Sequence, residues 1–257
     1  MLLNKIRFAV KFDKRGKVIS SNKDAIIPDL GTIILAGKTK AGKSTIARDI
    51  LYAKRRLYSY LYVISGSEGV NRDYCKHTPK RLIFSKFNEE SIKKIFKEQS
   101  KAFRKYGQKI AMVFDDSTND KKFLKNPWFL KLIQQGRQYG ILLILCTQYL
   151  MSIPKETRKN AEFISFCTEK SIKSRKDLFN DYFGFFEHFR DFDDVFKKYT
   201  KKHQFVFINL QASGYEPKNC MYHYMSNSVV NDKYSRSFKI GSSELWHKAR
   251  KVTGMRT

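Results

Sequence analysis

Short apolar runs alternate with amphipathic stretches along most of the chain after residue 31. Several of these runs are too short for buried helices, and they predict strands that are covered on both faces. They are TIILA (32–36), YLYVIS (60–65), RLIF (81–84), IAMVF (110–114), ILLILC (141–146), EFISFC (162–167) and QFVFINL (204–210). Strands that alternate with helices predict an α/β fold with a mostly parallel central sheet flanked by helices.

The clearest helical pattern lies between Asn88 and Tyr106. Apolar residues recur there every three or four positions, namely Ile92, Ile95, Phe96, Ala102, Phe103 and Tyr106. Asn88 suits the N-cap and Gly107 follows the last turn, so both ends of the helix are marked. Aromatic residues recur at the same spacing from Phe179 to Phe196, which favours a packed helix pair over exposed platforms for base stacking.

The two ends of the chain differ from this central pattern. Residues 5–20 alternate apolar and polar positions around the turn sequence DKRG, which predicts a β-hairpin. Residues 231–257 contain seven Lys or Arg and resemble a basic tail or an arm onto a neighbouring subunit. We therefore expect one domain with an N-terminal hairpin or arm (1–30), a core (31–210) and a C-terminal extension (211–257).

Charge changes the picture most strongly. Lys and Arg number 51 against 24 Asp and Glu, a net charge of +27, which points to a polyanionic partner and to nucleic acid first. The longest aliphatic run, from Ile141 to Cys146, is too short for a membrane span. The N-terminus has no apolar stretch as long as that of a signal peptide. Four scattered cysteines without a CxxC pair fit free thiols. We expect a soluble protein of a reducing compartment that is not secreted.

The segment GKTKAGKS, from Gly37 to Ser44, matches G-x-x-x-x-G-K-[ST] between a predicted strand and a predicted helix. In such a loop, backbone N–H groups and a helix N-terminus hold the phosphates of a nucleotide. Lys43 would reach the β and γ oxygens and Ser44 would ligate Mg²⁺. We therefore predict ATP and Mg²⁺ as cofactors, bound by Gly37, Lys38, Thr39, Lys40, Ala41, Gly42, Lys43, Ser44 and Thr45. Lys40 stands where many such loops have Gly.

Two carboxylates end a buried strand in IAMVFDDS. A carboxylate at the carboxyl end of a strand beside a phosphate loop can hold the Mg²⁺ shell, and a second one can accept the proton of the attacking water. Asp115 suits the metal role and Asp116 the base role. Without the phosphate loop, a strand that ends in two Asp would fit a simple turn equally well.

Two further polar residues flank the strand ILLILC. Arg137 lies in QQGRQYG before the strand, where it could meet the γ-phosphate of a neighbouring subunit and stabilise the transition state. Gln148 follows the strand, where it could sense the γ-phosphate or position water. Alone, each of these residues would fit a surface or capping role.

These residues together resemble the poxvirus-type virion DNA-packaging ATPases, within the FtsK–HerA superfamily of ring-forming DNA translocases. The resemblance covers roughly residues 30–170. It is carried by GKTKAGKST, MVFDDS, QQGRQYGILLILCTQYLMSIP and NAEFISFC. It implies a RecA-like P-loop NTPase core in which the Gln148 strand lies between the phosphate-loop strand and the Asp115 strand.

The resemblance also implies an activity and partners. It implies ATP hydrolysis by a homo-oligomeric ring, a pentamer or hexamer, in which Arg137 is supplied in trans. The substrate would be double-stranded DNA that is driven into a preformed capsid, at a viral assembly site in the host cell or in the virion. Asp116 stands where many relatives in the wider superfamily have Glu, but poxvirus-type members also show Asp-Asp.

Three other functions are compatible with parts of this pattern. Another DNA-pumping ATPase of the FtsK–HerA type would share every motif, although 257 residues leave little room for the extra domains of cellular members. A nucleoside or nucleotide kinase also needs a phosphate loop, but not a net charge of +27. A DNA-binding or scaffold protein with a degenerate nucleotide site has no chemical reason to retain Lys43, Ser44, Asp115, Asp116, Arg137 and Gln148.

Overall fold

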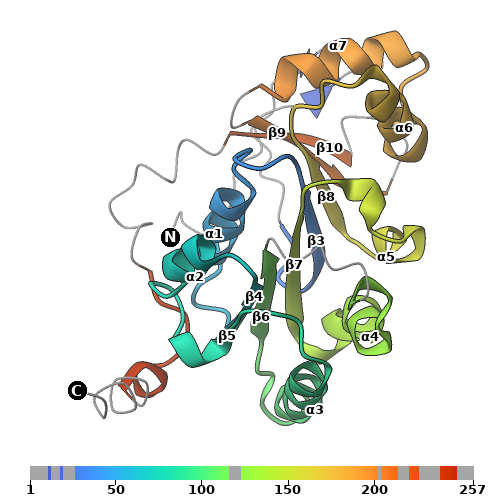
Figure 1. Ribbon diagram of the computed structural model, residues 1–257. Helices are drawn as coiled ribbons and strands as arrows, with labels where there is room; N and C mark the ends of the chain where they lie inside the picture. The colour runs from blue at the N-terminus through green and yellow to red at the C-terminus, as the bar shows by residue number, and fades with distance from the viewer. Residues whose placement is uncertain are drawn as a thin grey trace.

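A mixed eight-stranded sheet forms the centre of the protein (Figure 1). The computed structural model describes residues 11–12, 18–19, 27–115, 123–201, 204–213, 220–225 and 238–247. The strand order is β10-β9-β8-β3-β7-β6-β4-β5. The bounds are β3 Gly31–Ala36, β4 Tyr60–Ser65, β5 Ile83–Phe84, β6 Ile110–Asp115, β7 Ile141–Thr147, β8 Phe163–Phe166, β9 Gln204–Asn209 and β10 Met221–Met225.

Six neighbouring strands of this sheet form a parallel set, and β9 alone runs against the direction of the other seven. β8, β3, β7, β6, β4 and β5 are parallel to their neighbours, whereas β9 is antiparallel to β8 and to β10. The mostly parallel sheet that the sequence predicts is therefore confirmed. The Gln148 strand β7 lies between the phosphate-loop strand β3 and the Asp115 strand β6, as the family resemblance implies.

Helices cover both faces of the sheet, so every residue of β3, β6 and β7 is buried. One face packs against α1 (Lys43–Ala53) and α2 (Glu68–Tyr74), and the other carries most of the remaining helices (Figure 1). These are α3 Glu89–Tyr106, α4 Pro127–Gln135, α5 Lys155–Lys159, α6 Ile172–Tyr182 and α7 Phe189–Tyr199. Two hydrophobic cores result, one on each face.

The predicted long helix is α3, and its ends are those the sequence indicates. The Asn88 side chain accepts a hydrogen bond from Ser91 N at 2.8 Å, and Gly107 ends the helix with a φ of 64°. Tyr106 differs from the prediction: it is 71% exposed rather than part of the packed stripe. It is the last helical residue, beyond the part of α3 that covers the sheet.

The aromatic stretch forms the predicted helix pair α6 and α7. The ring centroids of Phe183, just after α6, and Phe192 on α7 lie 4.5 Å apart, and both residues are fully buried. Arg175 on α6 and Asp193 on α7 add a buried ion pair between the helices. Packing, not base stacking, explains this aromatic periodicity.

The ends of the chain are described only in part. β1 (Lys11–Phe12) and β2 (Val18–Ile19) form an antiparallel pair, which confirms the predicted hairpin for those residues. The sheet continues past residue 210 through β10, and the core beside α1 includes Phe238 and Ile240. The division into arm, core and extension stays a prediction. Within the ranges given above, no helix has both the length and the apolar character that a membrane crossing needs.

Candidate nucleotide-binding site

The loop between β3 and α1 is shaped by residues with special backbone geometry. Gly42, the N-cap of α1, has a φ of 106°, and Lys40 has a φ of 64°. A positive φ explains why many such loops have Gly where this chain has Lys40, since a side chain there costs about 1 kcal/mol. Gly37 donates from its N–H to Thr147 O at 3.0 Å, and a Cβ on Gly37 would collide with Cys167. A side chain at position 37 would push the loop away from β8.

Lys43 closes the loop from its carboxyl end. Its Nζ donates hydrogen bonds to Gly37 O at 2.7 Å and to Lys38 O at 3.0 Å. Lys43 is the first residue of α1, so the ammonium group and the positive end of the helix lie on the same side of the loop. A helix N-terminus beside an ammonium group suits the binding of an anion.

Asp115 ends β6 beside this anion site and is 2% exposed. Its carboxylate accepts hydrogen bonds from Ser44 and, at 3.4 Å, from Tyr74 Oη. Burial raises the pKa of Asp115, while the hydrogen bond from Ser44 and the charge of Lys43 act against that rise. A hydroxyl and a carboxylate are hard oxygen ligands, so Ser44 and Asp115 fit Mg²⁺ by their chemistry.

Gln148 completes the arrangement from β7. It follows the last residue of that strand and lines a cavity of about 370 Å³ together with the loop and Asp115. The residues around this cavity are Thr39, Lys40, Gly42, Lys43, Ser44, Thr45, Ser67, Val70, Asp115 and Gln148. The structure thus brings together most of the predicted nucleotide and metal residues. The predicted base, Asp116, lies outside the described residues.

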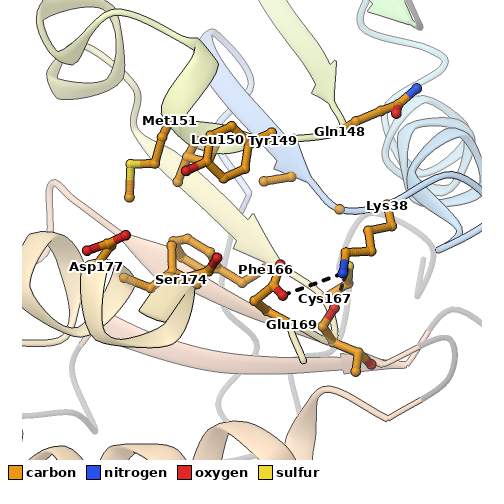
Figure 2. A pocket seen from close by; sticks show the side chains of 14 residues that line it. Lys38, Gln148, Tyr149, Leu150, Met151, Phe166, Cys167, Glu169, Ser174 and Asp177 are labelled. Carbon is orange, nitrogen blue, oxygen red and sulfur yellow. Dashed lines mark hydrogen bonds and ion pairs between the residues drawn. The ribbon is translucent and has the colours of Figure 1, made fainter. Parts of the chain in front are cut away.

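A second pocket lies beside the same loop (Figure 2). It is lined by the first residues of the loop, Gly37 and Lys38, and by apolar side chains from the ends of β7 and β8. Lys38 Nζ lies 3.5 Å from Glu169 Oε1, and Gln148 points away from this pocket in Figure 2. Lys38 therefore contributes its backbone to the phosphate loop while its side chain reaches toward Glu169. Ala41 packs against the sheet core beside α1.

Arg137 lies at the opposite edge of the sheet. It belongs to a short turn (Gly136–Tyr139) that precedes β7, whereas the phosphate loop follows the carboxyl end of the parallel strand β3. Seven residues of β7 separate the two edges, a span of roughly 20 Å at about 3.3 Å per residue. Arg137 pairs with Glu162 instead, so the structure does not bring it to the loop of its own chain.

Sequence reasoning missed several residues that contact predicted site residues, and Tyr74 and Glu162 are two of them. Tyr74 on α2 is fully buried and donates to Asp115, and Glu162 is buried beneath Arg137. Tyr74 belongs to no motif, and Glu162 reads as the first residue of a strand. The signal that could have indicated Glu162 is its charge at the start of the apolar run EFISFC, where an isolated carboxylate needs a partner.

A phosphate loop after β3, an acidic residue at the end of β6 and a polar residue on the strand between them define a P-loop NTPase with a RecA-like fold. Sequence comparison finds uncharacterized viral proteins as relatives of this chain. No protein-family model matches it. Uncharacterized protein 075L of Invertebrate iridescent virus 6 is 28% identical over 214 residues, which is 82% of each chain.

Solved structures share the fold. The genome packaging NTPase B204 from Sulfolobus turreted icosahedral virus 2, in complex with sulfate, superposes with a TM-score of 0.55 at 17% identity, over 77% of this chain and 97% of B204. B204 is also known in complex with AMPPCP and with ATP-gammaS. The pCW3 conjugation coupling protein TcpA has a TM-score of 0.57 at 16% identity, over 95% of this chain and 70% of TcpA. The predicted likeness to viral packaging ATPases is confirmed for the fold, and the poxvirus-type subgroup stays a prediction.

Proposed function

We propose that this protein is an ATP-driven translocase of double-stranded DNA that packages a viral genome into a preformed capsid and works as a homo-oligomeric ring. The observation that carries the proposal is the convergence of Lys43, Ser44, Asp115 and Gln148 on one cavity. It occurs on the same fold as a viral genome packaging NTPase that binds ATP analogues.

We assign the steps of ATP hydrolysis to the residues of the cavity and to Asp116. The N–H groups of the loop and the N-terminus of α1 hold the phosphates, and Lys43 Nζ neutralises the β and γ oxygens. Mg²⁺, when bound, would offset charge on the phosphates, and Ser44 and Asp115 would hold it. Asp116 accepts the proton of the attacking water and Gln148 orients that water. The water oxygen bonds to the γ-phosphorus as the bond from that phosphorus to the bridging oxygen breaks in line, so ADP leaves and inorganic phosphate forms.

The charge of the chain supports DNA as the polymer that is moved. A net charge of +27 suits contacts to the phosphate backbone, which carry no sequence information and weaken steeply with salt. A motor that packages a whole genome needs such sequence-independent contacts.

The position of Arg137 supports a ring. Its guanidinium is exposed on the edge of the sheet opposite the phosphate loop, so it can serve a phosphate site only on another copy of the chain. In a ring whose subunits all face the same way, each amino edge can meet the carboxyl edge of the next subunit. Capsid proteins are the further partners, at a viral assembly site in the cytoplasm of the host cell or in the virion.

A second candidate is another DNA-pumping ATPase of the FtsK–HerA type. The observation that favours it is the likeness to the conjugation coupling protein TcpA over 95% of this chain. It shares the hydrolysis chemistry and the ring with the first candidate but not the capsid.

The proposal is tested by the steady-state ATPase rate of the purified protein with and without long double-stranded DNA. We expect duplex DNA to stimulate hydrolysis at low salt, and Lys43→Ala and Asp116→Ala to remove it in protein that remains folded. Adding purified empty capsids would separate the two candidates, because only a packaging motor moves DNA into them. Hydrolysis that is indifferent to DNA but accelerated by a nucleoside would favour a kinase.

A further inference from the structure

The partner of Arg137 within its own chain is a buried carboxylate. Arg137 Nη1 donates to Glu162 Oε1 at 2.9 Å. The Arg137 side chain is 67% exposed, whereas that of Glu162 is only 9% exposed. The carboxylate is thus buried, whereas the guanidinium lies at the protein surface.

The backbone of Glu162 is held on both sides. Its N–H donates to Thr32 O at 2.8 Å, and its carbonyl accepts from Leu210 N at 2.8 Å, which ties it to the start of β3 and the end of β9. Its carboxylate lies over Gly31, where a Cβ would collide with the carboxylate, and Gly31 has a φ of 108°. Glycine therefore leaves the space that the carboxylate occupies.

The turn that carries Arg137 is fixed as well. Gln99 on α3 is buried and donates from Nε2 to Tyr139 O at 2.9 Å. The rings of Phe96 and Tyr139 pack edge to face with centroids 4.8 Å apart. Backbone and guanidinium of Arg137 are thus each anchored, although most of the side chain faces outward.

Stability alone gives a weak reason for this arrangement. Ion pairs with an exposed partner contribute little to folding, and burying a carboxylate is costly. Burial raises the pKa of Glu162 even though the charge of Arg137 acts against that rise. Orientation is a better reason, because an arginine fork has five N–H donors and one contact to Glu162 leaves others directed outward.

We propose that Glu162 is a positioning residue for Arg137: its carboxylate holds the guanidinium at the amino edge of the sheet, oriented to enter the phosphate site of the neighbouring subunit. This inference rests on the proposed function, in which Arg137 acts in trans. Glu162 itself does not touch the nucleotide.

The test is Glu162→Gln, which keeps the shape of the side chain and removes its charge. We expect the DNA-stimulated kcat to fall roughly tenfold to a hundredfold, the range of a misplaced catalytic group. The KM for ATP should stay the same, because the phosphate loop of the same chain lies at the other edge. Arg137→Ala should cost about a thousandfold, and the Arg137→Ala/Glu162→Gln double variant should be no slower than Arg137→Ala.

Mixing of variants separates positioning from a general structural role. An Asp116→Ala subunit has a dead phosphate site but an intact Arg137–Glu162 pair, so mixing it with Glu162→Gln should restore activity. Mixing Glu162→Gln with Arg137→Ala should restore none, since both defects lie on the same side of the subunit. Rescue by Arg137→Ala, or failure of rescue by Asp116→Ala, would overturn the inference.

A matched control comes from Arg158 and Asp181, which pair through Nη1 and Oδ2 at the same 2.9 Å. We expect Asp181→Asn to lower the thermal unfolding midpoint without changing kcat. If Glu162→Gln does not fold, Glu162→Asp replaces it, with a lower kcat and the same pattern of rescue expected. If the folded Glu162 variant has the wild-type kcat while Arg137→Ala is inactive, the positioning role of Glu162 is refuted but the shared site is not. A fully active Arg137→Ala would instead refute the shared site of the proposed function.

Discussion

Lys43 Nζ lies 2.7 Å from the carbonyl oxygen of Gly37, the residue that begins the loop whose end Lys43 marks. This hydrogen bond spans the loop and holds the ammonium group beside the proposed phosphate site. Gly37 is in turn held to the end of β7 by its hydrogen bond to Thr147 O. Hydrogen bonds therefore link the lysine to the start of the loop and the loop to the strand that precedes Gln148.

Removing the Lys43 ammonium should weaken ATP binding strongly. We expect Lys43→Ala to weaken the binding of a fluorescent ATP analogue by about a hundredfold or more and to stop hydrolysis, since the ammonium group that spans the loop is lost. Lys97→Ala, a change of equal charge on the exposed side of α3, serves as the control and should bind normally. Equal affinities of the two variants would show that the loop does not hold the phosphates.

Tyr74 should influence the metal through Asp115. Tyr74→Phe removes one hydrogen bond to the carboxylate, at 3.4 Å, and keeps the buried ring. We expect the Mg²⁺ concentration for half-maximal ATPase activity to rise about tenfold, as for other groups that orient a metal ligand. Tyr58→Phe is the matched control, because the Tyr58 hydroxyl is also buried but donates to Asp29 O. An unchanged Mg²⁺ requirement in Tyr74→Phe would show that this hydrogen bond has no part in metal binding.

Asp49 on α1 predicts a pH dependence of stability. Burial raises the pKa of its carboxyl from 3.8 to about 7, against the effects of the hydrogen bond from Tyr224 and the charge of Arg48. The folded state thus holds a proton that the unfolded state releases above pH 4, so Asp49 destabilises the fold increasingly as pH rises from 4 through 7. Asp49→Asn removes this dependence and can still accept from Tyr224.

Urea unfolding of wild type and Asp49→Asn at pH 5 and pH 8.5 measures the effect. We expect similar free energies of unfolding at pH 5 and a gain on the order of 2 kcal/mol for Asp49→Asn at pH 8.5. The other titrating groups are common to both proteins, so their contributions cancel in the difference. Parallel pH profiles would mean that Asp49 is charged in the folded protein at both pH values.

The segment that follows the acidic pair in the sequence is a candidate for contacts to DNA. Lys121 and Lys122 lie there, outside the described residues, and the sequence alone motivates their test. We expect Lys121→Ala/Lys122→Ala to reduce the slope of log affinity against log salt by about two, one for each lost phosphate contact. Lys94→Ala/Lys97→Ala, on the exposed side of α3, is the charge-matched control. An equal slope in wild type and the Lys121→Ala/Lys122→Ala variant would show that these two lysines do not contact DNA.

Much of the fold could be predicted because its signals are local. The buried strands β3, β6 and β7 read directly from short apolar runs, and Asn88 and Gly107 mark the ends of α3. The antiparallel position of β9 beside β8 could not be predicted, since it depends on contacts between residues far apart in the chain. The exposure of Tyr106 could not be predicted either. Helical periodicity shows on which face of the helix a residue lies, but not how far along the helix the contact with the sheet extends.

The site divides in the same way. Lys43, Ser44 and Asp115 could be predicted from motifs because the chemistry of phosphate and Mg²⁺ fixes their residue types and spacing. The contacts of Tyr74 and Glu162 could not, because each acts through a partner that only the folded chain brings near. The parallel arrangement of β3 and β7 determines where Arg137 lies. Because Arg137 precedes β7, it lies at the amino ends of these strands, away from the phosphate loop.

The central claim is that hydrolysis drives movement along duplex DNA, and displacement of a third strand measures this most directly. A labelled oligonucleotide bound as a triplex at one end of a long duplex is released only when a motor travelling along the duplex reaches it. We predict release that requires ATP and Mg²⁺, a lag that grows in proportion to the length of duplex, and no release by Lys43→Ala. Hydrolysis stimulated by DNA with the third strand left in place at every length would contradict the account.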